Sequence, residues 1–301
     1  MNLTNLYKKM ITKALTGGVM VYILFSLTIG AIGLRNSPER LSASEISETE
    51  TEQDINSLEG TWQLMAAKLA HTSAGESSEF SAEAGVVSLK IFTRNRFVTL
   101  RYDKETHTLL GTGGGTYIQL GDQFTEYIDY HSWDSTLIDY PQTFTCVFEG
   151  DLFTQSGIIK GGNTDGQALE EVYQRIEDPF TYRSDLNPLV GSWKLDKWAN
   201  GDVEIPAPPE EGLHGFKLFT PTYFYAMRYR DTGGISTFAF GNYVVGQDYL
   251  KETVVSVGDL SSVGRSYTFT WSIDGNQLTQ SGFLDSDQFM GYKIEEYYLR
   301  E

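Results

Sequence analysis

Two arginines and two glutamates occupy corresponding places in a sequence that repeats itself, and they are the strongest candidates for chemistry. Residues i, i+2 and i+4 of a strand lie on one face. By this rule Glu126 shares a face with Phe124 and Ile128, which places its carboxylate in an apolar stripe. A buried carboxylate is costly unless it is paired or protonated. Arg101, on the inward face of another expected strand, is the predicted partner of Glu126.

The same arrangement recurs in the second half of the chain, where Arg228 is the predicted partner of Glu252. Tyr117 in the first copy and Tyr243 in the second are expected to lie close enough to hydrogen-bond these pairs. One interpretation makes these residues a polar anchor at the bottom of a ligand cavity. The other is a structural ion pair that fixes strand register. Its presence in both copies favours the structural role.

The other reactive side chains form no catalytic or metal-binding pattern. The spacing of the four histidines fits no set of zinc ligands: His71, His107, His131 and His214. His131 is followed by Ser132 and Asp134, but the members of a catalytic triad usually come from separate segments. We expect His131 to face solvent. No metal and no cofactor are predicted.

Cys146 is the single cysteine of the chain and alternates with phenylalanines in the run 143–148. We expect it to be a buried strand thiol, since no activating base is nearby in sequence. With one cysteine, an intrachain disulfide is excluded.

A glycine-rich run, Gly111-Thr112-Gly113-Gly114-Gly115, resembles a phosphate loop only in composition. No helix follows it and no Lys-Ser/Thr closes it, which excludes that function. The run predicts a sharply bent strand or a bulge, and Gly233-Gly234 in the second copy agrees.

All these residues lie in a tandem duplication. Lys90-Ile91-Phe92-Thr93 returns as Lys217-Leu218-Phe219-Thr220. Each copy consists of short alternating runs separated by turn signals, and none has a convincing amphipathic helix. In copy one the runs are 86–93, 97–103, 115–120, 123–131, 142–149, 152–158 and 169–176. With the strand around Trp62 they number about eight, which favours an up-and-down barrel.

The N-terminal region indicates that the rest of the chain is exported across a membrane. Residues 14–34 are uncharged and mostly apolar, long enough to cross a bilayer, and follow three lysines (Lys8, Lys9, Lys13). A cleaved signal peptide ending near residues 31–33 is the alternative. Either would send the rest of the chain across the membrane. Residues 36–56 then predict an acidic, solvated tether.

The charge of the chain restricts its partners. The net charge is −17, and the first 35 residues contain no acidic side chain, so the excess of acid falls after them. This balance argues against nucleic acid and against electrostatic attachment to anionic lipid.

The start and the end of each copy carry a further motif. A Gly-x-Trp on the first strand, about eight strands, and an arginine on the last strand resemble the lipocalin-like (calycin) barrels. The residues are Gly60, Trp62 and Arg175 in copy one, and Gly191, Trp193 and Arg300 in copy two. The resemblance implies that the tryptophan closes one barrel end and that the arginine packs over it. Classical lipocalins usually carry a disulfide, so the lipocalin-like domains of bacterial envelope proteins fit better.

The sequence therefore predicts an all-β protein with two tandem eight-stranded antiparallel lipocalin-like barrels. The expected organisation is a membrane segment (1–35), a linker (36–56), a first barrel (57–178), an interdomain linker (179–187) and a second barrel (188–301). The favoured function is non-catalytic binding of a small apolar or amphipathic ligand in a barrel, outside the cytoplasm. The alternatives are a structural or protein-interaction role with filled barrels, and an enzyme on this fold.

Overall fold

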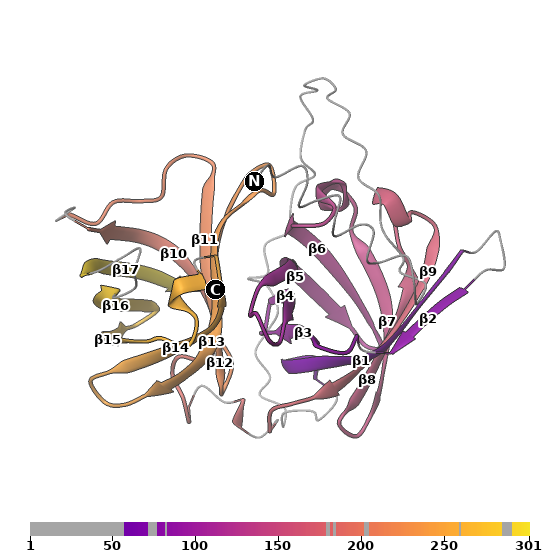
Figure 1. Cartoon of the computed structure of the whole chain (residues 1–301), viewed down its shortest axis with the longest axis horizontal. Helices are drawn as coiled ribbons and strands as arrows, with labels where there is room; N and C mark the ends of the chain where they lie inside the picture. The colour runs from indigo at the N-terminus through magenta and orange to yellow at the C-terminus, as the bar shows by residue number, and fades with distance from the viewer. Residues whose placement is uncertain are drawn as a thin grey trace, which may run out of the picture. The chain divides into compact units, whose positions relative to one another are not determined.

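The structure, a computed structural model, describes residues 57–71, 77–81, 83–178, 181–182, 185–201, 205–258, 260–284 and 291–301. In these ranges the chain is almost entirely β-strand (Figure 1). Among them lie short 3-10 turns: η2 (Ser135–Asp139), η3 (Gly162–Thr164) and η5 (Leu260–Ser262). No helix of the described ranges is long and apolar enough to span a bilayer. The membrane segment expected at 14–34 and the linker at 36–56 lie outside the described residues.

The first barrel, drawn from indigo to rose in Figure 1, closes through pairing of its first and last strands. Neighbours along the chain pair antiparallel, and β2 adds a short extra strand beside the second half of β1. The strands are β1 (Gly60–His71), β2 (Ser77–Ser81), β3 (Val86–Phe92), β4 (Arg96–Asp103), β5 (Leu109–Leu120), β6 (Gln123–His131), β7 (Gln142–Glu149), β8 (Leu152–Ile158) and β9 (Gln167–Arg175).

The second barrel, in orange to yellow, has the same antiparallel order and is also closed. Its strands are β10 (Gly191–Asn200), β11 (Leu213–Phe219), β12 (Tyr223–Arg230), β13 (Ile235–Val245), β14 (Leu250–Val257), β15 (Ser266–Asp274), β16 (Gln277–Leu284) and β17 (Tyr292–Arg300). The predicted architecture, two tandem eight-stranded antiparallel barrels, is confirmed.

The interior of each barrel is filled largely by aromatic side chains. Burial alternates along the strands as expected, for example in β6, where every second residue is buried. Because each inward residue meets residues from several other strands, large rings can fill the centre of a small barrel. Cys146 belongs to this interior and is buried, as predicted. The core of barrel one contains Leu58, Trp62, Phe92, Phe97, Tyr117, Phe124, Ile128, Phe144, Cys146, Phe153 and Tyr173.

A third apolar cluster joins the outer faces of the two barrels. Leu89 and Ile91 flank the inward Lys90 on β3, so their side chains point outward, and they pack in one cluster with Phe216 and Leu218 of β11. The two copies therefore meet through equivalent strands. No sequence pattern indicated this contact, because outward apolar residues on a strand do not reveal what covers them.

Polar bonds surround this contact between the barrels. Arg96 donates from Nη2 to Oε1 of Glu301 at 2.8 Å and from Nη1 to Asp129 at 3.3 Å. The hydroxyl of Tyr225 lies 2.8 Å from Thr112 Oγ1 and 3.1 Å from the hydroxyl of Tyr130. Such charged and hydroxyl bonds at a buried contact fix the register of the two surfaces.

The glycine run lies in β5, which is longer than the predicted strand because the glycines hide its alternation. The pairing of β5 with β6 shifts between Gly114 and Gly115, which confirms the predicted bulge. A Cβ on Gly115 would lie 1.9 Å from the backbone oxygen of Tyr127. Gly241 has the same contact in barrel two, at 2.0 Å from the backbone oxygen of Thr253. Gly233, expected at a bend, instead lies in the turn after β12 with a φ of 77°.

Replacement of Gly115 by alanine should therefore destabilise the protein. The added methyl group must displace the backbone of β6, and overpacking of this kind costs about 3 kcal/mol. Urea denaturation measures the loss. Gly258→Ala is the matched control, because a Cβ there meets nothing within 4 Å. Equal stability of the two variants would contradict the bulge assignment.

Candidate functional site

The Gly-x-Trp motif and the terminal arginine come together at one end of each barrel. Trp62 and Arg175 are cross-strand partners, and the guanidinium lies 4.0 Å from the ring. Arg175 also donates to the carbonyl oxygens of Glu59 at 2.8 Å and Ser57 at 3.0 Å. A Cβ on Gly60 would lie 2.8 Å from Arg175 Nη1, and Gly60 has a φ of 139°. Glycine is thus required by both its backbone conformation and the arginine above it.

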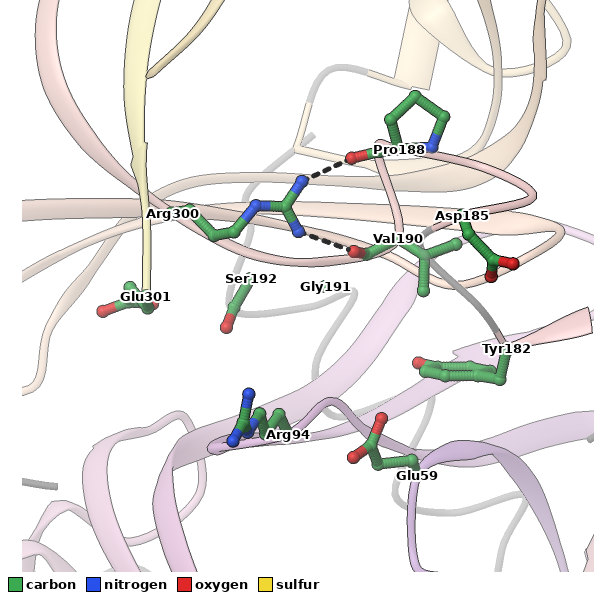
Figure 2. Close-up of a pocket in the computed structure, with 10 residues that line it drawn as sticks. All are labelled: Glu59, Arg94, Tyr182, Asp185, Pro188, Val190, Gly191, Ser192, Arg300 and Glu301. Carbon is green, nitrogen blue, oxygen red and sulfur yellow. Dashed lines mark hydrogen bonds between the residues drawn. The ribbon is translucent and has the colours of Figure 1, made fainter. Parts of the chain in front are cut away.

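Barrel two repeats this arrangement with Trp193 and Arg300, again 4.0 Å apart. The indole nitrogen of each tryptophan donates to a carbonyl four residues earlier, at 2.7 Å in both barrels. The guanidinium of Arg300 donates to the carbonyl oxygens of Pro188 and Val190 (Figure 2). The motif thus ties the segment that enters each barrel to its last strand.

The predicted Arg–Glu pairs are wrong. Lys90 of β3 pairs with Glu126, with Nζ 2.6 Å from Oε1. Lys217 of β11 pairs with Glu252 at 2.5 Å. Arg101 instead reaches the exposed Glu83 at 3.2 Å.

The strand register explains the error. Lys90 is paired with Thr99 on β4, whereas Arg101 is paired with Ser88, two residues farther from the buried layer. The backbone of Arg101 therefore lies nearer the rim of the barrel than the backbone of Lys90. A signal was present in the sequence: Lys90 shares a face with Phe92, and both recur in copy two.

Each lysine belongs to a hydrogen-bonded chain that crosses the barrel. Lys90 donates to Gln155 Oε1 at 2.7 Å, and Gln155 Nε2 donates to Glu171 Oε2 at 2.6 Å. The hydroxyl of Tyr173 donates to the same carboxylate oxygen at 2.9 Å. In barrel two Lys217 donates to Gln280 at 3.0 Å. Sequence reasoning missed both glutamines, because a single glutamine on an alternating strand carries no sign of its partner.

Aromatic rings enclose the lysine of barrel one. Its ammonium lies between 5.5 and 6.0 Å from the centroids of five rings, within the range of cation–π attraction. Burial raises the pKa of Glu126, and the Lys90 ammonium partly offsets that shift. Glu252 is affected in the same way, with Lys217 as the offsetting group. The rings are Phe92, Phe97, Phe124, Phe144 and Tyr173.

Tyr117 and Tyr243 do not bond the carboxylates as expected. Tyr117 is the cross-strand partner of Glu126, but its hydroxyl donates to the carbonyl oxygen of Thr93 at 2.7 Å. The hydroxyl of Tyr243 donates to the carbonyl oxygen of Thr220 at 2.6 Å. A phenol reaches well beyond its own strand, so pairing in register does not place its hydroxyl beside the neighbouring side chain.

His131 is half-buried and takes no part in a catalytic triad. Its Nδ1 accepts a hydrogen bond from the backbone of Asp134 at 3.0 Å. The Asp134 carboxylate instead accepts backbone bonds from Thr136 at 3.0 Å and Asn163 at 2.9 Å. Burial lowers the pKa of His131 to about 4, which keeps the ring neutral at physiological pH.

A cavity of about 610 Å³ lies where the two barrels join (Figure 2). Glu59 and Arg94 from barrel one border one side, and Ser192 and Arg300 from barrel two border the other. The full lining is Glu59, Arg94, Tyr182, Asp185, Pro188, Val190, Gly191, Ser192, Arg300 and Glu301. The cavity thus brings Gly191 and Arg300 of the closure motif of barrel two together with Glu59 and Arg94 of barrel one and with the connecting segment.

The charged groups of this cavity differ in how they are used. The guanidinium of Arg300 is held over Trp193, and the carboxylate of Glu301 by Arg96. Arg94 is exposed and pairs with no carboxylate of the described residues. Burial raises the pKa of Glu59, and Arg94 partly offsets the shift. Arg94 is therefore the cation of this cavity that remains available to a bound anion.

Lys90→Met should destabilise the protein by about 3–5 kcal/mol, because it leaves Glu126 buried without its cation. Lys90→Met combined with Glu126→Gln should recover most of this loss. Chemical denaturation of the wild type, the single variant and the double variant tests the coupling. Lys104→Ala removes an exposed lysine and is the control. If the single and the double variant lost the same free energy of unfolding, the two side chains would not be a coupled pair.

His131 should make stability depend on pH. The folded state holds its pKa near 4, below the ordinary value of 6.5, so the unfolded chain takes up the proton first. The stability that the neutral ring contributes is present above pH 6.5 and decreases by up to about 3 kcal/mol toward pH 4. His131→Asn keeps an acceptor for Asp134 and cannot titrate. Unfolding curves of the two proteins that stay parallel across this range would disprove the assignment.

No protein-family model matches the chain, and no curated protein matches it. Similar solved structures include an uncharacterized protein from Saccharomyces cerevisiae, with 9% identity over 78% of this chain and 97% of that one, at a TM-score of 0.40. Transferrin binding protein B from Haemophilus parasuis, a vaccine antigen, has 10% identity over 79% of this chain and 45% of its own, at 0.25. A DUF3598-family protein of unknown function from Nostoc punctiforme has 10% identity over 81% and 96%, at 0.21. Because these TM-scores are low, the architecture of the chain rests on its own strand pairing.

Proposed function

We propose that the chain is a membrane-tethered, extracytoplasmic protein that binds a small polar ligand without transforming it. The observation that carries the proposal is the cavity between the barrels. Its volume of about 610 Å³ is within the range of small-molecule sites, about 300–1,000 Å³. The tether is supported by the apolar run at 14–34 and the lysines before it.

The lining of the cavity favours an ionic ligand over the apolar or amphipathic one expected from the sequence. Arg94 offers a guanidinium fork suited to a carboxylate or a phosphate. Glu59 lies on the same side of the cavity and can accept a hydrogen bond from the same molecule. The ligand that fits this lining is a small molecule with an anionic group directed at Arg94.

The buried carboxylates fit a non-catalytic role. Glu126 and Glu252 are each only 5% exposed and are already bonded to lysines. A general acid or base must come within hydrogen-bond reach of its substrate. Here that position is occupied by the protein's own side chains.

A structural or protein-interaction role with filled barrels is the second candidate. The aromatic filling around Lys90 and Lys217 favours it, because these layers leave the pairs no access to solvent. The two candidates differ in what they predict for the cavity between the barrels.

Native mass spectrometry of the full chain, purified in mild detergent from its own source, tests the proposal. We expect a bound small molecule on the wild type and its loss in Arg94→Ala, because the variant removes the cation that holds the anionic group. Lys104→Ala, which removes an exposed lysine outside the lining, should keep the ligand. Wild-type protein without any adduct, or an adduct that Arg94→Ala retains, would favour the filled-barrel alternative.

A further inference from the structure

The two barrels differ by one internal cation. In barrel two the guanidinium of Arg228 donates to Glu296 Oε1 at 2.7 Å and lies 4.0 Å from the ring of Trp198. Trp198 and Glu296 are cross-strand partners on β10 and β17. The carboxylate of barrel two is therefore covered by a stacked guanidinium that the chain itself supplies.

Glu171 is the counterpart of Glu296 in barrel one. Each glutamate lies four residues before the arginine of the Trp–Arg closure pair, on the last strand of its barrel. On the first strand, past the same bulge, Glu171 is paired with Ala67 and Glu296 with Trp198. Glu171 is half-buried, and its Oε2 accepts from the neutral groups of Gln155 and Tyr173. No lysine or arginine of the described residues forms an ion pair with it.

Two substitutions separate the barrels at this place. Ala67 stands where Trp198 supplies an indole, so β1 offers no ring on which a guanidinium could stack. Ser88, the cross-strand partner of Arg101, is the counterpart of Gly215, the cross-strand partner of Arg228. A Cβ on Gly215 would lie 2.8 Å from Leu195 Cδ2 and 3.4 Å from Arg228 Cγ, so the packing around this arginine depends on the glycine.

Arg101, the counterpart of Arg228, accordingly turns to the rim. Its side chain is 41% exposed, against 18% for Arg228, and it bonds Glu83 at 3.2 Å. The interior of barrel one therefore contains the Lys90 ammonium with the carboxylates of Glu126 and Glu171. In barrel two, by contrast, two cations face two carboxylates.

We propose that barrel one binds a small organic cation of the guanidinium class on Glu171, in the place that Arg228 takes in barrel two. Barrel two shows that this fold accepts a guanidinium on the equivalent carboxylate. Charge-assisted hydrogen bonds between a guanidinium and a carboxylate are among the strong polar contacts in proteins. The site is separate from the cavity between the barrels and goes beyond the function proposed for that cavity.

The probe is n-propylguanidinium, which reproduces the end of an arginine side chain, with n-propylurea as its uncharged analogue. We expect the full-length wild type to bind one equivalent of the guanidinium in a ligand-observed NMR titration and not to bind the urea. Glu171→Gln keeps an acceptor for Gln155 and Tyr173 but loses the charge, and should weaken binding at least tenfold. Glu83→Gln, a rim control, should change it less than about twofold. Binding that Glu171→Gln leaves unchanged would overturn the proposal.

Three further variants keep the test decisive. Arg228→Ala vacates the equivalent place in barrel two, so the stoichiometry should rise from one to two. If the probe bound to Arg228→Ala but not to the wild type, the proposal would be overturned. If Glu171→Gln fails to fold, Ala67→Trp replaces it in the test. This variant supplies a ring on which Arg101 can stack and should weaken probe binding at least tenfold, and unchanged binding would count against the site. Arg94→Ala should leave probe binding intact, which separates this site from the cavity between the barrels.

Discussion

An ammonium group held between a carboxylate and aromatic rings lies at the centre of each barrel, and the surrounding residues are arranged to keep it there. Taking Lys90 and Glu126 out of water is unfavourable, and their mutual attraction repays this only when further hydrogen bonds satisfy the remaining donors and acceptors. Gln155 supplies such a bond to Lys90, and the rings exclude water that would screen the pair. Because β3 and β6 are not neighbours in the sheet, the pair also ties opposite parts of the barrel wall together.

The duplication kept this centre and changed what lies around it. Both copies retain the lysine, the paired glutamate, the glutamine and the Trp–Arg closure. They diverge one layer away, where barrel two pairs Arg228 with Glu296 and barrel one leaves Glu171 with neutral donors. Both members of each lysine–glutamate pair are buried, and leaving either charge unpaired would be costly.

The contact between the barrels uses surface that a single barrel would expose to solvent. The outer faces of β3 and β11 form one apolar cluster, and Arg96 bonds the side chain of Glu301 beside it. A cavity lined by residues of both barrels and by the connecting segment adjoins this contact. The cavity is thus a product of the duplication, because neither copy lines it alone.

The sequence by itself determined the features that depend on local periodicity and on repetition. These are the all-β class, the eight strands that close each barrel, the tandem duplication and a bend or bulge in the glycine run. The packing of Arg175 over Trp62 was implied by the family resemblance. Only the tertiary structure decided which cation meets Glu126, because barrel closure and stagger, not alternation, set the level of each inward residue. Alternation gives only the face of a strand, and it led to Arg101 as the predicted partner of Glu126. Lys90 lies two residues away in register, and only the closed barrel places it beside the carboxylate. The contact between the barrels likewise depended on two surfaces far apart in the chain, whose fit has no trace in either strand alone.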